Sequence, residues 1–141
     1  MRVHQLLASK GSDVVTVPPD TTVTQLMSLL SEHNIGAVVV SEGDGSVTGI
    51  VSERDIVRAL SRDTGAAQAP VHQIMTSDVC TCDDDCSVEE LMIEMTEQRA
   101  RHLPVLKDGR MVGIVSIGDV VKSRITQLEF EREQLTSYLA Q

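Results

Sequence analysis

Two short stretches of this 141-residue chain carry residue types and a spacing that suit ligand binding. In each stretch a glycine and two β-branched residues lead into Ser-x-x-Asp, which pairs Ser52 with Asp55 and Ser116 with Asp119. An apolar pattern with helical spacing follows each pair, so the order predicts a buried strand that runs directly into a helix. A serine at the start of that helix can hold a phosphate, while the carboxylate one turn later accepts hydrogen bonds from a sugar diol.

The alternative for each pair is an ordinary capping box, in which the acidic residue bonds back to its own helix cap. Two other helix starts use a longer side chain at this position, Gln25 and Glu90. Because aspartate has a shorter arm, we expect Asp55 and Asp119 to turn outward. One copy alone would favour capping, but two copies at matching places favour a ligand site.

The charge of the chain limits the classes of partner. The formal net charge is -9 and the pI is about 4.7, which argues against nucleic acid or an anionic membrane as the main partner. No apolar run approaches membrane-spanning length, and the N-terminus lacks the apolar core of a signal peptide. We therefore expect a cytoplasmic protein. Phe130 and Tyr138 are the only aromatic residues, so aliphatic side chains must sandwich any planar ligand.

Three clustered cysteines, Cys80, Cys82 and Cys86, raise the alternative of a thiol or metal sensor, since three thiolates and a carboxylate could complete a tetrahedral site. Their spacing matches no usual zinc pair. Cys80 and Cys82 also stand where Val15 and Val17 stand in an internal repeat, which predicts strand residues that pack as small hydrophobes.

That repeat decides the expected architecture. The matched segments are 3–7 with 71–75, 13–17 with 78–82, 23–33 with 88–98, and 49–55 with 113–119. Small insertions at residues 8–10 and near Gly43 shift the register, and we expect both in turns. A unit of this size buries its own apolar face poorly, so two copies should pack together.

Each unit reads as strand, helix, strand, strand, helix, which predicts an α/β (α+β) fold of two tandem repeats with pseudo-two-fold symmetry. Short glycine-containing turns predict that the second and third strands form an antiparallel hairpin. Pro104 should lie at a sheet edge or where pairing stops. The expected strands are 14–17, 36–40, 47–51, 79–82, 102–106 and 111–115, and the helices include 23–33 and 88–98. The expected domains are a first repeat at 1–62, a linker at 63–70, a second repeat at 71–125, and an extended C-terminal helix at 116–141.

The C-terminal helix carries apolar residues at alternating spacings of four and three. They are Val121, Ile125, Leu128, Leu135 and Leu139, with Arg132 as one charged interruption. This heptad pattern is typical of a self-association seam. The alternative is an amphipathic helix that folds back onto its own body.

Together these features resemble a pair of cystathionine-β-synthase-type (CBS) domains over residues 3–125. The two Gly-Ile-Val-Ser-x-x-Asp stretches and the run Arg-His-Leu-Pro-Val at 101–105 carry the resemblance, and the chain is similar to the small stand-alone CBS-pair proteins. The resemblance implies a pseudo-two-fold pair of α/β units with two clefts. Such clefts hold adenine nucleotides or related adenosyl compounds, and they regulate rather than catalyse.

The resemblance also implies a role for individual residues. Both motif aspartates, Asp55 and Asp119, would accept from ribose hydroxyls, and both serines would lie at phosphate. The first strand of each unit would line the adenine pocket, at Thr16, Val17, Thr81 and Cys82. His102, preceded by Arg101 and followed by Leu103 and Pro104, would contact phosphate. The first unit has Gly36 and Ala37 at the Arg and His positions, so we expect the second cleft to be the main phosphate site.

Basic residues concentrate beside that strand within an otherwise acidic chain, at Arg99, Arg101, His102, Lys107 and Arg110. A local cationic edge suits an anionic ligand. The alternative is a solvated basic face that balances nearby acids. Arg54 and Arg58 could supply charge to either cleft.

No serine or cysteine has a recognisable base and orienting group, and no lysine follows the glycines as in a Walker-type loop, so catalysis has no support. The leading hypothesis is a non-enzymatic regulatory homodimer that binds AMP, ADP or ATP, with NAD next, needs no obligatory cofactor or metal, and acts on a partner protein. The alternatives are a self-associating scaffold without ligand and the thiol or metal sensor.

Overall fold

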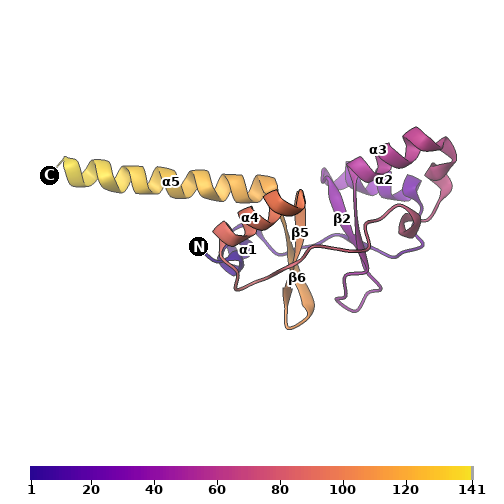
Figure 1. Ribbon diagram of the computed structural model, residues 1–141, viewed down its shortest axis with the longest axis horizontal. Coiled ribbons are helices and arrows are strands. Elements are labelled where there is room, and N and C mark those ends of the chain that lie inside the picture. Colours follow the sequence, from indigo (N-terminus) through magenta and orange to yellow (C-terminus); the bar gives the residue numbers. More distant parts are fainter. Residues whose placement is uncertain (141) are drawn as a thin grey trace.

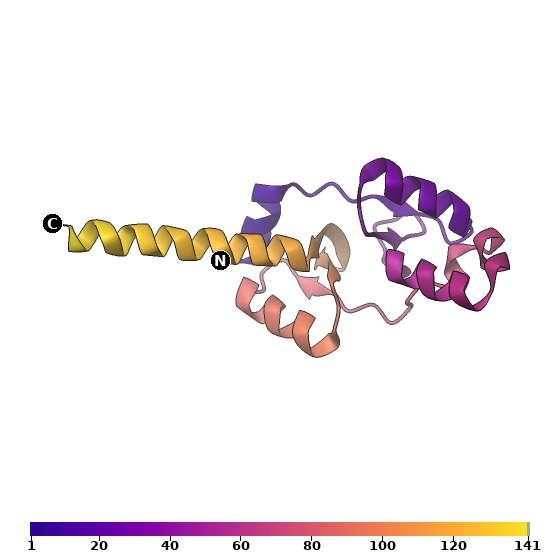
Figure 2. The same cartoon turned by 90° about the horizontal axis from the view of Figure 1, so that it is seen from above.

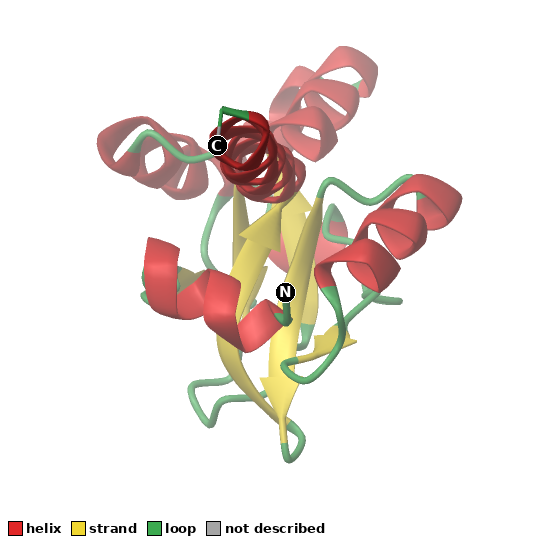
Figure 3. Ribbon diagram, turned by 90° about the vertical axis from the view of Figure 1, so that its left-hand side faces the viewer, coloured by secondary structure: helices red, strands yellow, loops and turns green. Residues whose placement is uncertain are grey.

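The computed structural model describes residues 1–140 and contains two similar units, each combining a three-stranded sheet with helices (Figure 1). The helices are α1 (Val3–Lys10), α2 (Val23–His33), α3 (Glu53–Arg62), α4 (Val88–Gln98) and α5 (Ile117–Leu139), with short 3₁₀ helices η1 (Thr64–Gln68) and η2 (Val71–Gln73). The strands are β1 (Thr16–Val17), β2 (Ala37–Val40), β3 (Gly49–Ser52), β4 (Cys82–Asp83), β5 (His102–Lys107) and β6 (Arg110–Ser116). Figure 3 shows the helices arranged around the strands. The predicted α/β fold of tandem repeats with a long C-terminal helix is confirmed.

The two sheets have the same connectivity. β2 pairs in parallel with β1 and antiparallel with β3, and β5 pairs in the same way with β4 and β6. Both expected hairpins are therefore confirmed. Pro104 lies on β5, the central strand of its sheet, so its predicted place on an edge is wrong. The alternative prediction, a point where pairing stops, is correct. Pairing between β5 and β4 begins only at Val105, so no hydrogen bond from residue 104 is needed on that side.

Local signals explain why α2 and α4 form where the sequence predicts them. Each begins behind a hydroxyl cap, Thr22 or Ser87, whose side-chain oxygen accepts a hydrogen bond from a backbone N–H in the first turn. Each ends at a residue in the left-handed conformation, Asn34 or Arg99, both with φ of 53°. Because this conformation stops the helix and turns the chain, β2 and β5 begin at equivalent places in the two units.

The segments that precede the units are exchanged between them. α1 lies beside the second unit in both views of the molecule (Figures 1 and 2). Its buried Val3, Leu6 and Leu7 belong to the core of that unit, and the Val3 N–H donates to the Cys86 carbonyl at 2.9 Å. The matching residue Val71 belongs instead to the core of the first unit. Each unit therefore completes the apolar core of the other.

Further local predictions are wrong, and one of them is the start of the first strand, because β1 begins at Thr16 and not at residue 14. Residues 8–10 do not form a turn, because α1 continues through Lys10. β4 is shorter than expected, so Cys80 lies before the strand and not within it. All three cysteines are half-buried and pack against the second core, however, which agrees with the small-hydrophobe interpretation of Cys80 and Cys82.

α5 does not fold back onto its own body. It packs near its start against α1, α4 and β6, and beyond that region it projects away from both units (Figures 1 and 2). Val120 is its buried residue, whereas the expected heptad stripe is exposed. Among the helices of residues 1–140, α5 included, none combines the length and apolar character needed to cross a membrane.

Candidate functional site

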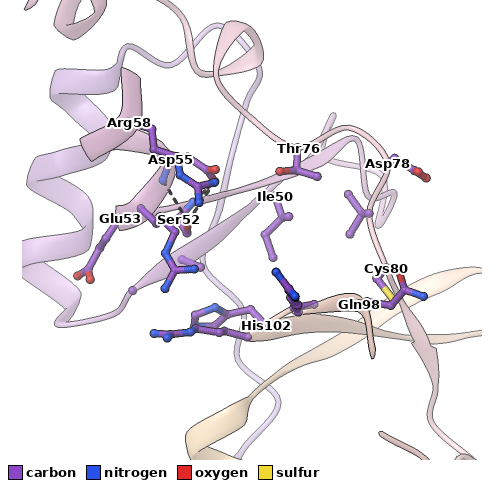
Figure 4. A pocket seen from close by; sticks show the side chains of 17 residues that line it. Ile50, Ser52, Glu53, Asp55, Arg58, Thr76, Asp78, Cys80, Gln98 and His102 are labelled. Carbon is purple, nitrogen blue, oxygen red and sulfur yellow. Dashed lines mark hydrogen bonds between the residues drawn. The ribbon is translucent and has the colours of Figure 1, made fainter. Parts of the chain in front are cut away.

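A cavity of about 520 Å³ opens between the two units beside the first Ser-x-x-Asp copy (Figure 4). Its walls come from the start of β2, the end of β3, the first turns of α3, the segment before β4, and the turn between α4 and β5. Its size falls within the range of small-molecule sites. The polar and charged lining residues are Ser52, Glu53, Arg54, Asp55, Arg58, Thr76, Asp78, Gln98, Arg99, Arg101 and His102.

The first motif copy forms a capping box, so the prediction that its aspartate avoids its own cap is wrong. The Ser52 N–H donates to Asp55 Oδ2 at 2.8 Å, and the Asp55 N–H donates to Ser52 Oγ at 3.3 Å. Ser52 Oγ also donates to Asp55 Oδ2 at 3.1 Å. The extended backbone of Ser52 brings its N–H over the first turn, within reach of the short carboxylate. Both bonds to the Asp55 carboxylate end on Oδ2, so Oδ1 remains available beside the cavity.

The second motif copy has the same capping box but no place in the cavity. The Ser116 N–H donates to Asp119 Oδ2 at 2.9 Å, and the Asp119 N–H donates to Ser116 Oγ at 3.1 Å. Lys10 Nζ adds hydrogen bonds to Asp119 Oδ2 and to the Ile114 carbonyl, both at 2.6 Å. Burial alone would raise the pKa of Asp119, but the bonds from Lys10 and Ser116 outweigh it and hold the pKa below its usual value.

The basic edge of the second unit faces the motif of the first unit. Arg99, Arg101 and His102 line the same cavity as Ser52 and Asp55. The expectation that these residues line a cleft beside the second motif copy is therefore wrong. The starts of β2 and β5 both line this cavity, so the start of β5 lies opposite the motif of the first unit.

Small residues at the start of β2 leave room for this arrangement. A Cβ atom added at Gly36 would lie 3.9 Å from His102 Cε1 and 3.8 Å from Glu53 Oε2. Gly36 and Ala37 both line the cavity. An alanine would therefore fit at Gly36 in ordinary contact, whereas a longer side chain there would have to share its space with Glu53 and His102.

Four arginines surround the cavity, two from each unit: Arg54, Arg58, Arg99 and Arg101. None of them takes part in the ion pairs found within residues 1–140. The acidic Glu53 and Asp78 stand at opposite edges of the cavity (Figure 4). Burial lowers the pKa of His102, which favours its neutral form. The cavity therefore presents guanidinium groups without partners to an anionic ligand.

The remaining predicted site residues do not line this cavity: Thr16, Val17, Thr81, Cys82, Leu103, Pro104, Ser116 and Asp119. Val17 and Leu103 are core residues of the two units. The apolar part of the wall comes instead from Ala37, Ile50, Val79 and Ala100. These positions are aliphatic, as the scarcity of aromatic residues predicts.

Sequence reasoning missed Thr76 and Lys10. Thr76 forms a backbone bridge with Ile50, in which the Thr76 N–H donates to the Ile50 carbonyl at 2.8 Å. Lys10 forms an ion pair with Asp119 of the second motif copy. The signal that could have identified Lys10 is the insertion at residues 8–10, because it lengthens the segment in front of the first strand.

The three cysteines are free, and their placement does not favour the metal-sensor alternative. No group of three His, Cys, Asp or Glu side chains within residues 1–140 is placed to hold a metal ion. The pKa of Cys80 is raised to about 11, first by burial and then by the neighbouring Glu94. Glu94 accepts a hydrogen bond from Cys80 Sγ at 3.1 Å. Burial raises the pKa of Cys82 to about 12. Thiols with such values are poor nucleophiles and metal ligands at neutral pH.

Comparisons with known proteins agree with this architecture. The CBS domain family matches residues 7–62 and 71–125. A CBS domain-containing protein of Arabidopsis thaliana, CBSX3, mitochondrial, is 36% identical over 146 residues, covering 97% of this chain and 71% of that protein. The crystal structure of a CBS-domain protein from Agrobacterium tumefaciens is 46% identical, with a TM-score of 0.85 over 88% of this chain and 99% of that chain.

A further solved structure contains ligands. The CBS domain pair of protein MJ0100, in complex with 5′-methylthioadenosine and S-adenosyl-L-methionine, is 25% identical to this chain and has a TM-score of 0.81. The match covers 90% of this chain and 98% of that one. The duplicated motif, the two equivalent sheets and these matches lead to one conclusion: the chain belongs to the CBS domain family and carries two tandem copies of that domain.

Proposed function

We propose that this chain is a non-enzymatic regulatory module that binds an adenine nucleotide in the cavity between its two units. The observation that carries the proposal is the set of four arginines without ion-pair partners around one cavity, in a chain of net charge -9. Guanidinium groups bind phosphate through directed, charge-assisted hydrogen bonds. AMP, ADP or ATP is the first choice, and NAD is the second because its pyrophosphate could span the same cations.

The rest of the cavity suits the nucleoside part of such a ligand. Asp55 Oδ1 can accept from a ribose hydroxyl while Oδ2 keeps the helix cap. The aliphatic Ile50 and Val79 offer an apolar surface for the adenine ring. The adenosyl compounds in the MJ0100 complex support this ligand class. Phosphate contacts come from the arginines, because the Ser52 hydroxyl already donates to Asp55.

Both units contribute to the cavity, and this gives ligand binding a regulatory consequence. A ligand that contacts Asp55 on one unit and Arg101 on the other favours one packing of the two units over alternatives. The chain would act on a partner protein through that shift. We further propose that the chain works as a homodimer.

Calorimetric titration with AMP, ADP, ATP and NAD tests the ligand site. We expect one ligand per chain, and Asp55→Ala should weaken binding by about tenfold, the usual effect of losing one charge-assisted hydrogen bond. Asp119→Ala is the matched control, since it removes the equivalent carboxylate and the same capping bond but lies outside the cavity. Thermal unfolding of both variants corrects for the shared loss of the cap.

Two outcomes would contradict the proposal. Absence of binding heat with all four nucleotides would favour the scaffold hypothesis, in which the cavity holds no ligand. Equal loss of affinity in Asp55→Ala and Asp119→Ala would remove the cavity beside the first motif from the binding site.

A further inference from the structure

Five exposed apolar side chains of α5 lie along one stripe of the helix, whereas Ile117, Phe130 and Tyr138 lie outside that stripe. The members of this stripe are Val121, Ile125, Leu128, Leu135 and Leu139, with exposed fractions from 48% to 73%. They follow the alternating four-three spacing of heptad positions a and d. Apolar residues scattered singly on a surface need no explanation, but an extended stripe with one charged interruption indicates an interaction surface.

The outer part of α5 needs a partner for its stability. The elements that pack on α5 are α1, α4 and β6, and they contact its first turns, whereas the end near Leu139 projects from the body (Figures 1 and 2). A short isolated helix is marginally stable in water, because most helical stability in proteins comes from burial of an apolar face. A second helix packed on the stripe would supply that burial.

We propose that α5 forms a parallel two-stranded coiled coil with a second copy of this chain. This inference deepens the homodimer of the proposed function and does not depend on the nucleotide. Ile125 and Leu139 occupy position a, and Leu128 and Leu135 occupy position d, so the two stripes would meet layer by layer.

The charges beside the stripe favour the parallel orientation. Arg124 falls at position g and Glu129 at position e, the two positions that face each other across a parallel coiled coil. Arg124 of one chain would therefore pair with Glu129 of the partner subunit, twice per dimer. The present contact between Arg124 and Glu89 is 3.9 Å long and exposed, so it holds Arg124 only weakly.

The charged interruption in the stripe agrees with the same register. Arg132 occupies position a, and in a parallel pair it would lie beside Glu131 of the partner subunit at position g. In the antiparallel arrangement that overlaps the whole stripe, Glu129 would face Glu129 of the partner subunit, and Glu131 would face Glu131 of the partner subunit. Like charges at those positions would oppose that arrangement.

The mass of the protein in solution, measured by sedimentation equilibrium, tests the surface. We expect a dimer for the wild type and a monomer for Leu135→Asp, because a buried carboxylate in an apolar layer is strongly unfavourable. Phe130→Asp is the matched control: Phe130 is 61% exposed on the same helix but at the outward position f, so this variant should stay dimeric. A monomeric wild type, or equal loss of the dimer in the two variants, would overturn the proposal.

A charge exchange tests the orientation. Glu129→Arg should raise the dimer dissociation constant by about tenfold through like-charge contact with Arg124. The combined variant Arg124→Glu with Glu129→Arg should restore the dimer, since the pair is only reversed. Failure of this restoration would overturn the parallel register. Nucleotide titration of Leu135→Asp separates the two proposals, because unchanged affinity in a monomer leaves the ligand site standing.

Discussion

The two Ser-x-x-Asp copies have the same local geometry and opposite environments. The serine N–H to carboxylate distance is 2.8 Å at Asp55 and 2.9 Å at Asp119. Asp55 borders an open cavity with arginines, whereas Asp119 is covered by Lys10. Duplication of a motif has therefore preserved the cap in both units, while the surroundings decide whether a ligand can reach it.

Lys10 takes over a contact that the backbone makes in the other unit. The Ile50 carbonyl accepts from the Thr76 N–H at 2.8 Å, and the matching Ile114 carbonyl accepts from Lys10 Nζ at 2.6 Å. The insertion at residues 8–10 extends α1 so that this side chain reaches both Ile114 and Asp119. A change outside the motif has thus made the two copies unequal.

Removal of two arginines from the cavity beside the first motif copy should have the largest effect on nucleotide affinity. We expect the double variant Arg99→Ala with Arg101→Ala to weaken ATP binding by about a hundredfold, since each charged hydrogen bond contributes about 1.5–3 kcal/mol. Calorimetry measures the affinity. Lys107→Ala with Arg110→Ala is the control, because it removes the same charge from the same unit but from residues that do not line the cavity. Equal losses in the two double variants would mean that only the net charge matters.

Removing Lys10 should make the two copies more alike. In Lys10→Ala the Asp119 carboxylate loses its partner at 2.6 Å, and we expect calorimetric stoichiometry to rise from one nucleotide per chain to two. The second site should bind about tenfold more weakly, because the four cavity arginines lie beside the first copy. Lys122→Ala, which removes a nearby charge from α5, should leave one site. An unchanged stoichiometry in Lys10→Ala would show that Lys10 is not what closes the second copy.

The fold was predictable where short sequence signals act locally. The bounds of α2 and α4 agree with prediction because a hydroxyl cap starts each helix and an apolar stripe defines its face. The hairpins follow from their glycine-containing turns. α1 was not predicted as a helix, since its apolar residues Val3 and Leu6 pack on a unit distant in sequence.

The site was predictable in its residue types but not in their grouping. The sequence indicated Asp55, Arg101 and His102 as ligand contacts, yet it assigned the last two to the other cleft. Spacing along a chain describes one unit at a time, whereas this cavity is made where two units pack together. The same limit applies to Lys10, whose contact with Asp119 spans 109 positions.

Acidification should have a smaller effect. It should lower the stability of the ligand-free protein and raise the affinity for nucleotide. Burial lowers the pKa of His102 below its ordinary value of 6.5, although Asp119 and Glu53 oppose this and Lys10 and Arg101 add to it. His102 therefore binds a proton more readily in the unfolded chain than in the folded one. As the pH falls below 6.5, this difference lowers the free energy of unfolding. A bound phosphate would favour the charged imidazole, so nucleotide affinity should rise by about threefold over the same range.

His102→Gln separates this residue from the other histidines. It should remove the rise in nucleotide affinity, and calorimetry in buffers of different ionisation enthalpy should no longer detect proton uptake on binding. The melting temperature of the ligand-free variant should also fall less below pH 6.5 than that of the wild type. If His102→Gln retained the full pH dependence of binding, the phosphate would lie away from the start of β5. The open copy would then hold its ligand through Arg54 and Arg58 on α3, within the first unit alone.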